Sequence, residues 1–211
     1  MVRILSAVLL FAAGSASAAP AIPSFEFSVA SIQSSIAAFR ADQIKAKAGN
    51  LGPQLDNMAW DLQRYERETS RMRQELSYIQ SRLRRRTNPA PRPGQPDNDP
   101  SLRWDIQRFT RDLAQLARDT QWRLSDLRNL TAQAEKDETL VSPATRLLNA
   151  ARQFKSETNW LGMDARFAHF DFIRAGYTFE GMDLDRNSRD LDSNAQDLQT
   201  EADRLLAKVR P

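Results

Sequence analysis

The sequence predicts an all-α protein, an elongated bundle of about five helices with long antiparallel coiled-coil hairpins. Apolar residues recur three and four positions apart along most of the chain, which is the spacing of one helix face. Charged residues fill the positions between them. These patterns predict helices over residues 25–48, 53–87, 100–135, 143–161 and 164–208, with a proline-rich loop over 88–100.

The first 18 residues have the pattern of a secretory signal peptide. Arg3 precedes the apolar run Ile4–Ala13, and the small residues Ala16–Ala18 follow it. The run is too short for the roughly 20 residues of a membrane-spanning helix. We expect cleavage after Ala18 and a periplasmic or secreted protein, with residues 19–211 as a single helical-bundle domain. A buried N-terminal helix and an uncleaved anchor are the alternatives.

The first two helices are expected to be separated by a short break. Gly49 is expected to end the helix over 25–48, because glycine adopts the left-handed conformation without steric cost. Pro53 suits the first turn of the next helix. That helix carries the clearest apolar stripe of the chain, in four heptads with one polar exception: Leu55, Met58, Leu62, Tyr65, Thr69, Met72, Leu76, Ile79 and Leu83.

The remaining helices are predicted from caps and from similar stripes. Five prolines over 88–100 exclude a continuous helix there, and Asp99–Pro100 fits an N-cap with a first-turn proline. Ser142–Pro143 predicts the next start. Gly162 is expected to end that helix and Asp164 to cap the last one. The last helix is expected to place leucines seven residues apart, at Leu184, Leu191, Leu198 and Leu205.

Two segments suggest an internal repeat. Residues 60–68 and 104–112 share five of nine positions, including a tryptophan, and three more are conservative changes. The 44-residue offset keeps the heptad phase, so duplication of a helix explains the similarity. Chance similarity between two helices rich in Asp, Arg and Leu is the alternative. We expect Trp60 and Trp104 to be structural anchors packed against the neighbouring helix.

The composition excludes several kinds of active site. The 211 residues include no cysteine and one histidine, so thiolate metal sites, a cysteine nucleophile and multi-histidine metal sites are excluded. Seven glycines leave little room for a phosphate-binding loop. We therefore expect no catalytic residues, no metal site and no cofactor. The formal net charge of +3 creates no strong field for a polyanion.

A cluster of arginines lies at the end of the second predicted helix. Its members are Arg82, Arg84, Arg85, Arg86 and Arg92. Cations at a helix C-terminus are favoured by the helix dipole, which is a sufficient structural reason for them. Alternatively, they form an anion-binding tip for lipid headgroups, another envelope component or an acidic protein. Nucleic acid is not expected, because no aromatic residues interleave with these arginines.

The segment 154–179 is unusually rich in aromatic residues. Its candidate ligand-binding residues are Phe154, Trp160, Phe167, His169, Phe170 and Tyr177. We expect most of this segment to close one end of the bundle as core. A pocket for a small apolar ligand or cofactor is the alternative. His169 lies between Asp164 and Asp171 in the sequence, which would suit a general base, but no nucleophile stands at a diagnostic spacing.

Together these features predict an exported, non-catalytic helical protein with an interaction or scaffolding role. Long helices with charged flanks expose large side surfaces, and its partner is expected to be a protein, either another copy or a different chain. The alternatives are a carrier that uses the 154–179 region and a protein that binds anionic membrane surfaces through the arginine cluster.

Overall fold

The computed structural model describes the backbone of residues 24–86 and 100–210 and the side chains of residues 50–85 and 100–210. The chain divides into two units, Met1–Gln43 and Ile44–Pro211, and every described side chain belongs to the second. The predicted signal peptide lies outside the described residues, so its cleavage stays a prediction.

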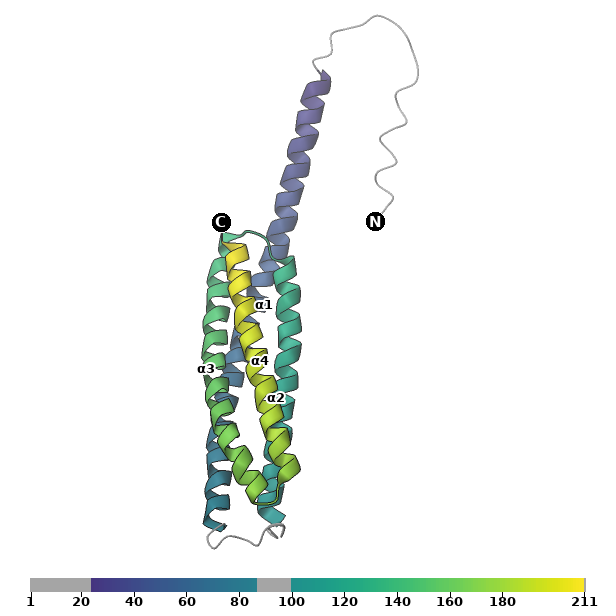
Figure 1. The fold of residues 1–211 in the computed structure, drawn as a ribbon. Helices are drawn as coiled ribbons and strands as arrows, with labels where there is room; N and C mark the ends of the chain where they lie inside the picture. Colours follow the sequence, from purple (N-terminus) through teal and green to yellow (C-terminus); the bar gives the residue numbers. More distant parts are fainter. Residues whose placement is uncertain (1–23, 87–99, 211) are drawn as a thin grey trace, which may run out of the picture. The chain divides into compact units, whose positions relative to one another are not determined.

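The described backbone forms four helices and no strand (Figure 1). They are α1 (Ser24–Arg86), α2 (Pro100–Gln133), α3 (Glu138–Arg174) and α4 (Thr178–Val209). The all-α prediction is confirmed, whereas the expected number of about five helices is wrong. Two predicted breaks are absent, and one break lies where none was expected.

The predicted break before Pro53 is absent, because α1 is helical throughout this stretch. A proline inside a helix removes one backbone hydrogen bond, so other contacts must hold this turn. Leu51 is buried in the core. Gly52 faces Leu140 and Pro143 of α3 at van der Waals distance. Leu55, just after the proline, is also buried, so tertiary packing on both sides of Pro53 keeps the helix continuous.

Helix α3 begins earlier and ends later than predicted. Its N-cap is Asp137, whose Oδ1 accepts a hydrogen bond of 2.8 Å from the backbone N–H of Thr139. Pro143 lies inside the helix instead of at its start, and Gly162 does not end it. The buried stripe continues past this glycine with four- and three-residue spacing, through Thr158, Leu161, Ala165, Ala168 and Phe172.

The break between α3 and α4 centres on Gly176. Its φ of 90° is the left-handed conformation that favours glycine. The N–H of Gly176 donates to Ile173 O (3.0 Å), and the N–H of Tyr177 donates to Phe172 O (2.9 Å). This pair of bonds is a Schellman motif, and the accompanying apolar residues Phe172 and Tyr177 are both buried.

Ion pairs between the helices establish how they are arranged. In the α1–α2 hairpin, Asp61 pairs with Arg123 (2.8 Å) and Arg82 with Asp105 (2.5 Å), so the two helices run antiparallel. Helices α3 and α4 are also antiparallel. Polar contacts join α1 to α3 and α2 to α4 in parallel register. Helices α2 and α3 therefore lie across the diagonal of a four-helix bundle.

The predicted stripes form the core of the bundle. All nine stripe residues of α1 are buried, as are the four leucines of α4 that lie seven residues apart. The polar exception, Thr69, donates its hydroxyl to the carbonyl of Tyr65 (2.8 Å) in its own helix. Buried hydroxyls of Thr110, Thr120 and Thr158 bond within their helices in the same way. These four buried threonine hydroxyls are thus satisfied within their own helices.

Candidate functional site

The aromatic candidates of the 154–179 region do not converge on one site. Phe154 and Tyr177 are buried in the core. Trp160, Phe167 and Phe170 point outward, and the two phenylalanines expose 68% and 65% of their surface. The expectation that most of this segment is core is therefore wrong for its exposed members. The helix phase explains this, because Phe167 and Phe170 fall between the buried positions of α3.

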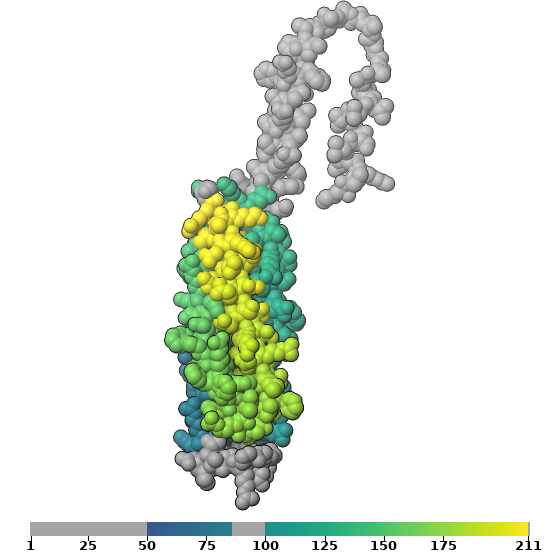
Figure 2. Space-filling view, in the orientation of Figure 1, coloured from purple at the N-terminus to yellow at the C-terminus, as the bar shows by residue number. Residues whose placement is uncertain are grey.

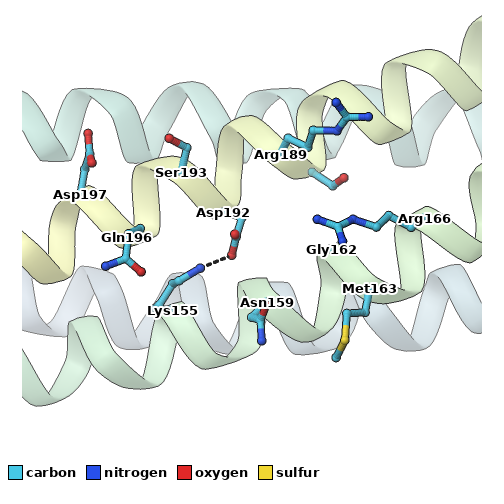
Figure 3. A pocket seen from close by; sticks show the side chains of 11 residues that line it. Lys155, Asn159, Gly162, Met163, Arg166, Arg189, Asp192, Ser193, Gln196 and Asp197 are labelled. Carbon is cyan, nitrogen blue, oxygen red and sulfur yellow. Dashed lines mark hydrogen bonds and ion pairs between the residues drawn. The ribbon is translucent and has the colours of Figure 1, made fainter.

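The surface groove in this region is polar. It lies between α3 and α4 beside Gly162, has a volume of about 330 Å³, and is lined mainly by polar and charged side chains (Figure 3). Lys155 and Asp192 form an ion pair of 2.5 Å across it. None of the six aromatic-region candidates lines this groove. A neighbouring open groove includes His169 and Phe170, together with Arg166, Asp185 and Arg189.

His169 is engaged with the backbone of α4. Its Nδ1 lies 2.9 Å from the carbonyl oxygen of Gly181, so the Nδ1–H donates to that carbonyl. Its ring packs edge-on against Phe170, with 5.2 Å between centroids. The two acids that flank it in the sequence, Asp164 and Asp171, pair instead with arginines of α1. Among the described residues, the Nδ1–H of His169 therefore meets a backbone carbonyl and not a carboxylate that would orient the ring as a general base.

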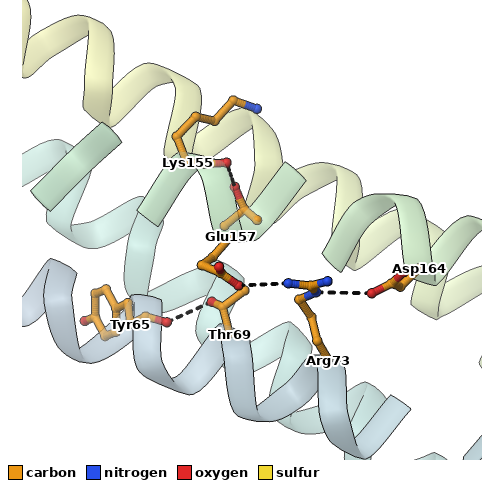
Figure 4. A network of polar contacts seen from close by, with 7 residues as sticks. Tyr65, Thr69, Arg73, Lys155, Glu157 and Asp164 are labelled. Atoms are coloured by element: carbon orange, nitrogen blue, oxygen red, sulfur yellow. Dashed lines mark hydrogen bonds and ion pairs between the residues drawn. The ribbon is translucent and has the colours of Figure 1, made fainter. Parts of the chain in front are cut away.

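A polar network joins α1 to α3 near the middle of the bundle (Figure 4). The guanidinium of Arg73 donates to Glu157 (3.2 Å) and to Asp164 (3.1 Å). Partial burial acts to lower the pKa of Arg73, but the hydrogen bonds to Asp164 and Glu157 outweigh it and raise the pKa. One guanidinium of α1 thus bridges two carboxyl groups of α3, so this network serves to align the two helices.

The predicted arginine cluster is partly used in holding the helices together. Arg82 donates to Asp105 (2.5 Å) and to Ser101 Oγ (2.9 Å), and Arg84 pairs with Asp171 (3.3 Å). Arg85 is exposed. The side chain of Arg86 and the whole of Arg92 lie outside the described residues. The pair between Arg84 and Asp171 brings the arginine cluster and the aromatic-rich segment to the same end of the bundle.

Exposed apolar side chains gather at this end of the α3–α4 hairpin. We call Phe167, Phe170, Ile173, Phe179 and Met182 the hairpin-end patch; all five are exposed, Phe179 by 80%. They come from the last turns of α3 and the first turns of α4. Ile173 lies next to Gly181, which is adjacent to Met182 in the chain. Apolar surface gathered in this way is typical of an interaction site.

Ile173, Phe179 and Met182 were not among the predicted site residues. For Ile173, a signal exists in the spacing of the buried residues of α3. The buried stripe of α3 continues through Ala165, Ala168 and Phe172, so an apolar residue outside that stripe must face away from the core. Because we expected a helix end at Gly162, the outward direction of Ile173 could not be predicted from the stripe that precedes this glycine.

The tryptophans of the proposed repeat are not structural anchors. Trp60 and Trp104 expose 59% and 54% of their surface, so that expectation is wrong. The guanidinium of Arg108 lies over the ring of Trp104, at 4.8 Å from its centroid. The core of this hairpin is filled instead by the aliphatic stripe and by Tyr65 and Phe109.

Searches of protein-family models, curated proteins and solved structures found no match to this chain. Among the described residues, no helix is both long and apolar enough to cross a lipid bilayer. The candidate site is therefore inferred from the described side chains alone. It is the hairpin-end patch, where five exposed apolar side chains gather that the core does not bury.

Proposed function

We propose that this protein is an exported, non-catalytic interaction protein that docks another cell component through the hairpin-end patch. The observation that carries this proposal is the exposure of five large apolar side chains on two consecutive helices. The exposed part of these side chains adds no burial energy to the folded chain. Export is supported only by the pattern of residues 1–18.

The interior of the bundle supports an external site in preference to an internal one. The largest side chains at the centre, including Phe109, Phe154 and Phe172, are fully buried. Phe154 and Tyr177, which a carrier would need beside its ligand, are part of this packing. The carrier alternative therefore receives less support than docking on the outer surface.

Site-specific photo-crosslinking tests the proposal in the cells that produce the protein. A benzoylphenylalanine at position 167 should give a covalent adduct with a neighbouring component on irradiation. The matched control is the same group at position 122, because Trp122 on α2 is as exposed as Phe167 but lies outside the patch. Equal adduct yields at the two positions, or none at 167, would contradict docking through the patch.

A further inference from the structure

The hairpin-end patch combines apolar and cationic side chains. We infer that it is a docking surface for an anionic lipid bilayer, with the apolar side chains entering the interfacial region and arginines contacting lipid phosphates. This inference rests on the proposed docking function and names the partner of the same site. Three features of the described residues support it: the divergence of the apolar side chains, the charge around them and the kinds of residue involved.

The apolar side chains diverge. Residues three apart on a helix differ by about 60° in direction, so Phe167, Phe170 and Ile173 spread over roughly 120° of α3. Phe179 and Met182 extend the patch onto α4. A single partner helix would contact one direction of such a convex surface. A bilayer interface is deformable and can accept all five side chains together.

The unpaired charge on the α3 side of the patch is positive. Asp171 pairs with Arg84 of α1, and Asp164 shares the guanidinium of Arg73 with Glu157. Arg166 and Arg174 are exposed on the last turns of α3 and form no ion pair with another described residue. These two guanidinium groups flank the patch phenylalanines along the chain and are available to phosphate oxygens.

The unpaired acidic residues nearby lie on the α4 side of the patch. Glu180 accepts a hydrogen bond from the neutral side-chain amide of Gln107 of α2 (3.2 Å) and has no ion pair among the described residues, whereas Asp185 pairs with Arg189. Asp183 is exposed and has no ion pair within the described residues. The lipid-facing orientation is therefore the one that buries α3 more deeply than α4.

The residue types also favour a bilayer over a protein surface. Aromatic and aliphatic side chains beside arginines are the composition of helices that lie in the membrane interface. Four of the patch residues are unbranched or aromatic and can adjust to lipid chains; the fifth is Ile173. Neither Arg166 nor Arg174 needs a fixed carboxylate partner if many phosphate groups are present.

Vesicle binding of the full-length mature chain tests the inference. The probes are vesicles with equal parts of phosphatidylglycerol and phosphatidylcholine, compared with vesicles of phosphatidylcholine alone, in a co-sedimentation assay over a range of salt concentrations. We expect preferential binding to the anionic vesicles that weakens as salt rises. Absence of binding, or equal and salt-independent binding to both vesicles, would overturn the inference.

Two double variants assign the binding to the patch. The variant F167S/F170S removes two aromatic rings and should lower the partition coefficient by at least about tenfold. The variant R166Q/R174Q should lower it by about fivefold for each arginine and flatten the salt dependence. The matched controls are W122S on α2 and R67Q/R71Q on α1, which remove exposed residues of the same kinds elsewhere.

The controls should bind within about twofold of the wild-type protein, since their residues lie outside the patch. All substituted residues are exposed, so helix content and the melting temperature should remain unchanged and confirm folding. If the controls lose as much binding as the patch variants, the assignment to the patch is wrong.

The lipid inference and the docking proposal fail separately. An adduct at position 167 that proves to be a protein, without vesicle binding, overturns the lipid inference and leaves docking intact. An adduct with lipid supports both. Absence of both the adduct and vesicle binding overturns both.

Discussion

The two hairpins of the bundle expose aromatic side chains in different ways. In the α1–α2 hairpin they are distributed along the helices, at Trp60, Tyr78, Trp104 and Trp122. The 44-residue offset between Trp60 and Trp104 also separates Tyr78 from Trp122. In the α3–α4 hairpin, by contrast, most of the exposed apolar residues gather at one end, in the hairpin-end patch. The helix segments that carry this patch are drawn in light green in Figure 2, at the lower end of the coloured bundle.

The distributed aromatics are partly covered by neighbouring cations. Arg108 lies over Trp104, and Arg82 lies 5.7 Å from the centroid of Tyr78. These arginines also form ion pairs across the hairpin, with Glu75 and Asp105. Such a ring contributes to an intramolecular contact even though it is exposed. Exposure alone is therefore a weak indication of a binding site, and gathering of several uncovered side chains is a stronger one.

The core of each hairpin should be far more sensitive to substitution than its exposed surface. Leu76→Asp places an unpaired charge at a fully buried position of α1 and should lower the free energy of unfolding by about 4 kcal/mol. Tyr78→Asp, two residues later on the exposed face, should cost only about 1 kcal/mol, which includes the loss of the ring contact with Arg82. Chemical denaturation followed by circular dichroism measures both. Equal losses would mean that the heptad register of α1 is wrong.

The same contrast holds for phenylalanines of α3. Phe154 is fully buried and its ring lies 6.1 Å from that of Tyr65, so Phe154→Ala should cost about 3–5 kcal/mol. Phe167→Ala should cost about 0.5 kcal/mol or less, because most of that side chain already faces solvent. Denaturation curves of the two variants provide the measurement. A large loss from Phe167→Ala would show that the patch serves folding and would weaken the docking proposal.

The sequence was sufficient to predict the core but not the ends of the helices. The three- and four-residue spacing identified the buried faces of α1 and α4, because burial of a helix stripe requires that period. Glycine permits a helix end but does not enforce one. Gly162 and Gly176 both permit it, and the helix continues through Gly162 because Leu161 and Ala165 lie on one buried stripe. Pro53 is likewise tolerated inside α1 because Leu51 and Leu55, on either side of it, are buried in the core.

The sequence predicted which segment is rich in aromatic residues, but not which of these residues face outward. The density of aromatic residues over 154–179 is evident in the sequence, and the region does contain most of the patch. Which rings face the core depends on the helix phase, and the phase depends on where α3 ends. The meeting of this region with the arginine cluster depends on the Arg84–Asp171 pair, a contact between residues far apart in the chain.

Two glycine substitutions sharpen the comparison between hairpin ends and helix interiors. Gly176→Ala forces a left-handed conformation on alanine and should cost about 1–2 kcal/mol. Gly162→Ala adds a methyl group into open space inside a helix and should stabilise the protein by about 0.5–1 kcal/mol. Thermal melts of the two variants should therefore shift in opposite directions. A loss of stability from Gly162→Ala would indicate that α3 does not run straight through this position.

The smallest expected effects come from the tryptophans of the proposed repeat. Trp60→Ser should change the free energy of unfolding by about 0.5 kcal/mol, as is usual for exposed positions. Trp104→Ser should cost about 0.5–1 kcal/mol more, because it also removes the contact with Arg108. In the double variant Trp104→Ser/Arg108→Gln, the separate losses should not add, and a double-mutant cycle measures the difference. Full additivity would show that the ring of Trp104 and the guanidinium of Arg108 do not interact. Trp104 would then be as uncovered as the residues of the hairpin-end patch, and the two hairpins would not differ in this respect.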